Sequence, residues 1–111
     1  MPQIELEMSE EFIPDLLSRR KVCTTRRSIH GKRGDTFTLS TKDGRDYQFR
    51  INTVISTTLK KAIDEYHYLD GFETPKDMFN WWIQNYKIEN IYEFASNYHK
   101  QKAFIHFISP D

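Results

Sequence analysis

The sequence predicts an α+β domain, a small mixed β-barrel with helices packed on its outside. Three observations predict this class: a β-hairpin over residues 36–51, two amphipathic helices over 58–66 and 74–86, and a closing apolar strand over 103–108. The expected order is β-α-β-β-β-α-α-β, and short strands in this order can close into a small barrel. A length of 111 residues fits one domain, 1–111.

The first part of the chain is expected to form a strand, a helix and a second strand. Ile4 and Leu6 alternate with polar residues, which is typical of a short strand. Ser9 is a suitable N-cap for a helix that begins at Glu10, because an acidic side chain suits the positive end of the helix dipole. The β-branched residues in Val22–Arg26 then favour a strand.

The hairpin is the clearest local signal. Residues 36–39 alternate in polarity, and so do residues 47–52 in the returning strand. Between them, Asp43-Gly44 suits a tight turn, because these residues readily take positive φ angles.

The second half of the chain is predicted to be mainly helical. Thr58 caps a helix whose apolar residues recur at helical spacing, and Thr74-Pro75 starts another with Trp82 on its apolar stripe. Residues 88–100 fit a short helix or a loop. Residues 103–108 form the last predicted strand.

The charge is balanced overall but unevenly distributed. Residues 1–18 carry five acids and no base, whereas residues 19–33 carry seven bases and no acid. Such a dense basic block predicts a surface for phosphate or nucleic acid, and the alternative is a solubilising loop that pairs with the acidic segment. The candidate ligand-binding residues in the block are Arg19, Arg20, Arg26, Arg27, His30, Lys32 and Arg33.

Aromatic residues near Asp70 add two further candidates. Tyr68 and Trp81 fall off the apolar stripe of the second helix, so they are candidates for stacking on nucleobases, although rings are more often core residues. The four histidines show no metal-ligand spacing, and no dinucleotide or phosphate-loop motif is present. We therefore expect neither a metal nor a cofactor.

Three features bear on the compartment. No apolar run approaches the roughly 20 residues of a membrane helix. The first residues lack the pattern of a signal peptide, and Cys23 is the only cysteine, so no intramolecular disulfide can form. These features favour a cytoplasmic protein without a membrane partner.

Four short segments, in order, resemble the ASCH family, which has a PUA-like barrel. They are Lys21-Val22-Cys23-Thr24-Thr25-Arg26, Lys32-Arg33-Gly34-Asp35-Thr36-Phe37, Asp70-Gly71-Phe72 and the apolar last strand. The chain departs from the family pattern at Val22, where the family often has Thr or Ser, and at Asp70, where many members have Glu.

The resemblance implies a cleft on one face of the barrel and an association with RNA. It also implies similarity to a branch that hydrolyses N4-acetylcytidine with a lysine, a threonine and a glutamate, which would correspond to Lys21, Thr24 and Asp70 here. Glu65 is a second candidate for the acid. Lys21 and Thr24 are three positions apart, so they share one cleft only if the strand starts after Lys21 or is bulged.

Three functional hypotheses follow. The first is a module that binds RNA, a nucleotide or a modified nucleoside through the basic block. The second is a small amidohydrolase acting on an N-acylated cytosine nucleoside. The third is a protein-interaction module, in which the acidic and basic segments support contacts within a homodimer; a monomer or a weak homodimer is expected.

Overall fold

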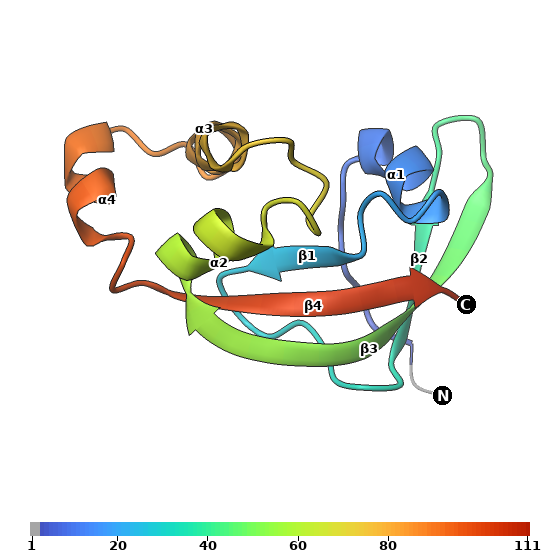
Figure 1. The fold of residues 1–111 in the computed structure, drawn as a ribbon. Helices are drawn as coiled ribbons and strands as arrows, with labels where there is room; N and C mark the ends of the chain where they lie inside the picture. Colours follow the sequence, from blue (N-terminus) through green and yellow to red (C-terminus); the bar gives the residue numbers. More distant parts are fainter. Residues whose placement is uncertain (1–2) are drawn as a thin grey trace.

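The computed structural model describes residues 3–111 and places a curled, four-stranded antiparallel sheet at the centre of the protein (Figure 1). The strands are β1 (Cys23–Arg26), β2 (Thr36–Ser40), β3 (Asp46–Thr58) and β4 (Lys102–Pro110). Their order in the sheet is β1-β4-β3-β2, so β1 and β2 are its two edges. The α+β prediction is confirmed, with a half-barrel as the form of the sheet.

Four α-helices accompany the sheet: α1 (Ile13–Leu17), α2 (Leu59–Tyr66), α3 (Pro75–Asn85) and α4 (Ile91–Asn97). In Figure 1, α2 and α3 lie over one face of the sheet, and the long loop between β1 and β2 runs past the opposite face. Caps fix the helix starts, because the side chains of Thr58, Thr74 and Asn90 each accept a hydrogen bond from a main-chain N–H in the first turn. Among residues 3–111, no helix is long and apolar enough to span a bilayer.

The core consists of two apolar clusters that share β3 and β4. One cluster lies under α2 and α3 and contains Trp82 and Ile105. The other lies at the hairpin end and contains Phe37 and Phe49, whose rings stack 5.6 Å apart. The hairpin prediction is confirmed, with Phe37 opposite Phe49 in the antiparallel register.

β3 is longer than expected. Its register against β4 shifts between Ile51 and Thr53, which marks a bulge where the extra residue bends the strand. The bulge lets one 13-residue strand pair first with β2 and then along the length of β4. The sequence signal ended at the bulge because the alternation of polar and apolar residues stops there.

The first predicted strand is wrong. Residues 4–7 do not form a strand; Gln3 makes an isolated parallel bridge to Thr36, and the Ile4 N–H donates to the Thr36 carbonyl at 2.8 Å. The predicted first helix starts as a 3₁₀ turn (Glu10–Phe12) before α1, and Ser9 stands at its N-cap without a side-chain cap bond. Residues 88–100 contain the helix α4, one of the two alternatives that the sequence allowed.

Candidate ligand pocket

A pocket of about 760 Å³ opens between the two edge strands of the half-barrel. The chain segment that precedes the 3₁₀ turn forms one wall, and α3 with the turn before it forms another. This segment is held at both sides: Gln3 Nε2 donates to Thr38 Oγ1 at 2.9 Å, and Arg26 Nη2 donates to the Glu7 carbonyl at 2.6 Å. This wall of the pocket is therefore bonded to both edge strands, to β2 through Gln3 and to β1 through Glu7.

A buried ion pair between Lys21 and Asp70 forms part of the pocket wall. Their side chains are 3% and 4% exposed, and Lys21 Nζ donates to both the carboxylate and the main-chain carbonyl of Asp70. The turn carrying Asp70 is fixed against the start of β1 because the Val22 N–H donates to the Leu69 carbonyl at 2.8 Å. Gly71 has a φ of 92° and lies against the Lys21 stem, so a positive-φ residue without a side chain is required there.

Two threonines on β1 also line the pocket. Thr25 Oγ1 donates to Asp70 Oδ2 at 2.8 Å, so both carboxylate oxygens are occupied by protein donors. Thr24 Oγ1 accepts a hydrogen bond from Arg26 Nε at 3.3 Å. β1 begins at Cys23, after Lys21, and Lys21 and Thr24 both line the pocket.

Thr25 was missed as a site residue by the sequence reasoning. Strand alternation gave no signal for it, because β1 begins at Cys23 and the alternation of sides does not extend back to Lys21. The adjacent Thr24 was predicted only because it matches the threonine of the ASCH motif.

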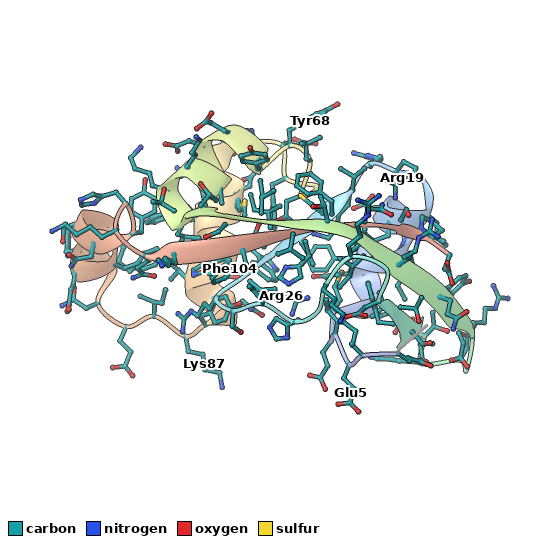
Figure 2. The ribbon with its side chains drawn as sticks, turned by 90° about the horizontal axis from the view of Figure 1, so that it is seen from below. Glu5, Arg19, Arg26, Tyr68, Lys87 and Phe104 are labelled. Carbon is teal, nitrogen blue, oxygen red and sulfur yellow. The ribbon has the colours of Figure 1, made fainter. Side chains whose placement is uncertain are left out.

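Two cations of the basic block line the pocket, Lys21 and Arg26, and Lys21 is the one paired with Asp70. Burial lowers the pKa of the Arg26 guanidinium, while Tyr86, Asp70 and Glu7 oppose that change. Arg26 makes no ion pair with a carboxylate anywhere in residues 3–111. Figure 2 labels Arg26 near the middle of the protein, whereas Glu5 points outward.

Aromatic rings form the rest of the pocket wall. Trp81 lies 5.8 Å from both Phe12 and Phe72, ring centre to ring centre, and all three line the pocket. On the other part of the rim, the Arg27 guanidinium stacks 4.0 Å from the centre of the Tyr86 ring. Because Tyr86 lines the pocket, the Arg27 guanidinium lies beside the pocket wall.

The remaining predicted site residues do not line this pocket. Glu65 is exposed on α2, and Tyr68 is 74% exposed and projects outward (Figure 2). Arg19 makes a hydrogen bond within the fold, in which its Nη1 donates to the Ile108 carbonyl at 2.9 Å. The others are exposed and lie before β1 or in the loop after it: Arg20, His30, Lys32 and Arg33.

The loop after β1 has its own anchor on β4. The His30 N–H donates to Nε2 of the buried His106 at 3.0 Å, and His106 Nδ1 lies 3.1 Å from the Phe104 carbonyl. Nε2 must be unprotonated to accept this bond, so the proton resides on Nδ1, which donates to Phe104. Burial lowers the pKa of His106, and the nearby His30 and Arg26 add to that effect.

The single cysteine, Cys23, is buried in the core. Burial raises the pKa of the Cys23 thiol, which makes it an inert core group. In the part of the chain from residue 3 onward, no three His, Cys, Asp or Glu side chains are grouped to hold a metal ion.

The architecture is similar to that of several solved structures. The ASCH domain from Lactobacillus crispatus JV V101 superposes with a TM-score of 0.62 over 97% of this chain and 78% of its own, at 10% identity. The chain has the fold of an ASCH domain. At this level of identity the similarity concerns the PUA-like fold alone.

Two further structures share this ASCH fold over nearly their whole length. PF0455 from Pyrococcus furiosus covers 97% of this chain and 96% of its own, with 17% identity and a TM-score of 0.62. The hypothetical protein PH0355 covers 94% of each chain, with 15% identity and a TM-score of 0.61. No family model matches the sequence, and no curated protein matches it.

Proposed function

We propose that this ASCH-fold chain binds RNA or a nucleotide-like ligand, with the ligand's phosphate at Arg26 and its base in the pocket. The observation that carries the proposal is the half-buried Arg26, which lines the pocket and has no carboxylate partner within residues 3–111. A partly desolvated guanidinium favours a phosphate, which its planar donors match in geometry. The ASCH fold is consistent with RNA binding.

The surroundings of Arg26 support a ligand with a flat ring. Trp81, Phe72 and Phe12 offer ring faces and edges within the same pocket. Aromatic side chains beside arginine bind single-stranded nucleic acid by stacking, which contributes about 1–3 kcal/mol per base. Arg27, stacked on Tyr86 at the rim, is positioned to contact the next phosphate of an RNA strand.

The test is salt-dependent binding of a fluorescent single-stranded RNA, measured by anisotropy. Changing Arg26, Arg27 and Arg33 to Ala together should weaken binding and flatten the salt slope by about 0.7 for each phosphate that the variant no longer neutralises. Arg45→Ala is the matched control, because Arg45 is exposed in the hairpin turn and does not line the pocket. Unchanged affinity in the triple variant, or no RNA binding by the wild type at low salt, would remove the RNA proposal.

Two partial variants separate the pocket rim from the outer loop. Arg26→Ala with Arg27→Ala should account for most of the decrease in affinity, whereas Lys32→Ala with Arg33→Ala should cost less because these residues lie outside the pocket. Isothermal titration with cytidine 5′-monophosphate, compared with cytidine, tests whether the phosphate is recognised at all. Equal affinity for the two compounds would contradict the role proposed for Arg26.

The second candidate is hydrolysis of an N-acylated cytosine nucleoside. Its support is that Lys21, Thr24 and Asp70 line one pocket. The ion pair favours binding over catalysis, because the Lys21 ammonium paired with Asp70 has no lone pair with which to take a proton from Thr24.

Incubation with N4-acetylcytidine, followed by chromatography for cytidine and acetate, tests this candidate directly. Thr24→Val should abolish turnover, and Thr53→Val, at an exposed position on β3, should not. Absence of product after hours at micromolar protein would exclude the amidohydrolase.

A further inference from the structure

The side chain of Trp82 is buried and carries one polar atom, the indole nitrogen. The residue lies on α3 and is 1% exposed. Its indole Nε1 is the buried side-chain nitrogen or oxygen without a hydrogen-bond partner in residues 3–111. Trp82 is also one of the residues that line the pocket, so the residue that carries this donor belongs to the wall of the proposed ligand site.

Leaving this donor unpaired is costly. Buried polar atoms in proteins nearly always have a partner, and an unsatisfied one costs about 1–3 kcal/mol. The other polar side chains buried in this wall are paired: Lys21 with Asp70, Thr25 with Asp70, and Thr24 with Arg26. The exception at Trp82 therefore calls for an acceptor that arrives from outside the chain.

The indole is held in place, so the protein cannot satisfy it by turning the ring. Trp82 packs in the core cluster with Met78 and Leu59, and its ring centre lies 4.5 Å from that of Tyr86. α3 is itself fixed at its start by the Thr74 cap, whose side chain accepts from the Asp77 N–H. A donor fixed in this way is prepared for an acceptor in one position, which reduces the entropy cost of binding.

We infer that the Trp82 indole N–H is a specificity-determining donor that receives a carbonyl-type acceptor on a planar ring bound in the pocket. The inference rests on the proposed function, in that the pocket is taken as a ligand site. A neutral, buried N–H suits a neutral carbonyl, while the charged group of the ligand pairs with Arg26. A site built this way discriminates against rings that lack the acceptor, because binding them leaves the N–H unpaired.

The first test follows the indole proton itself. The chain has two tryptophans, so its ¹H–¹⁵N spectrum contains two indole signals, and Trp81→Phe identifies which belongs to Trp82. The probe is 2-pyridone, a planar ring with one amide carbonyl, and toluene at equal concentration is the control. The Trp82 signal should move downfield with saturation for 2-pyridone, with no comparable shift for toluene.

The outcomes separate this inference from the proposed function. A Trp82 signal that 2-pyridone leaves unmoved, or that toluene moves equally, overturns the inference. If RNA and cytidine 5′-monophosphate fail to bind but 2-pyridone shifts the signal, the proposed function fails and the acceptor site stands. If cytidine 5′-monophosphate binds without affecting the Trp82 signal, the proposed function stands and the inference about the Trp82 N–H fails.

The second test removes the N–H while keeping the ring. Trp82→Phe would leave a cavity in the core, so genetic incorporation of 3-benzothienylalanine at position 82, which replaces N–H by sulfur, is the cleaner change. Affinity for 2-pyridone should fall about tenfold, in line with a hydrogen bond of ordinary strength. The same replacement at position 81 is the control and should have less effect; equal decreases at both positions would refute the role of the Trp82 N–H.

Discussion

Thr25 donates its hydroxyl to one oxygen of the Asp70 carboxylate, at 2.8 Å, while Lys21 occupies the other oxygen. The carboxylate thus joins β1 to the turn before α3 from both sides, although Thr25 and Asp70 are 45 positions apart. Thr25 is thus hydrogen-bonded to the Asp70 carboxylate, whereas the Thr24 hydroxyl is hydrogen-bonded to Arg26.

The two threonines should respond differently to removal of the hydroxyl. Thr25→Val removes a buried hydrogen bond to a charged group and should lower the free energy of unfolding by about 2 kcal/mol. Thr24→Val removes only the longer hydrogen bond from Arg26 and should cost about 1 kcal/mol or less. Urea titrations followed by circular dichroism measure both, and a larger decrease for Thr24→Val would contradict the bonding described here.

Breaking the Lys21–Asp70 pair should destabilise the protein strongly. Lys21→Met or Asp70→Leu leaves one buried charge without its partner, which costs about 3–5 kcal/mol. The double variant leaves neither charge buried, so its destabilisation should be much smaller than the sum of the two single effects. A double-mutant cycle in urea measures this coupling, and additive effects would show that the pair is not coupled.

Gly71 and Gly44 form a matched pair for testing how tightly the Asp70 turn packs. Both have positive φ angles, 92° and 87°, so alanine is strained by roughly 1–2 kcal/mol at either position. A Cβ at Gly44 meets nothing within 4 Å, whereas one at Gly71 lies 3.2 Å from Lys21 Cβ. Gly71→Ala should therefore reduce stability by about 1 kcal/mol more than Gly44→Ala, and equal decreases in urea titrations would contradict this packing.

His106 should make stability depend on pH. Its pKa in the folded protein is lowered from the ordinary value of 6.5, mainly by burial, so the unfolded chain takes up the proton more readily. The stabilisation is complete above pH 6.5 and declines as the pH falls through and below that value. His106→Gln should reduce this decline between pH 7 and 5, measured as urea midpoints.

The control for this pH effect is His99→Gln, since His99 is exposed on the surface after α4. It should leave the pH dependence unchanged. A His106 variant that keeps the full decline in stability would show that another group titrates there.

Helix starts and the hairpin turn were predictable because each depends on a few neighbouring residues. Thr58 and Thr74 mark helix starts that the structure reproduces, and Asp43-Gly44 marks the hairpin turn. The strand expected at residues 4–7 failed because alternation reports which residues are buried, and an extended segment that lines a pocket alternates without joining a sheet. The bulge in β3 has no sequence signal of its own.

The site was predictable only in part, because its geometry depends on contacts between distant segments. The resemblance named Lys21, Thr24 and Asp70, which do line one pocket. Periodicity placed Trp82 on the apolar stripe, where it packs, but it gave no sign of the unpaired N–H. The basic block suggested one continuous surface, whereas β1 directs Arg26 to the pocket and the loop carries Lys32 and Arg33 away from it.

The bulged strand β3 ties the two halves of the core into a single cooperative folding unit. Phe49 and Ile51 on one side of the bulge belong to the hairpin cluster, and Ile55 on the other side packs on the cluster under α2 and α3. Local opening of either half would break the ladder that the strand shares with β4. Slow amide exchange along β3 should therefore report the same opening free energy on both sides of residue 52, that of global unfolding.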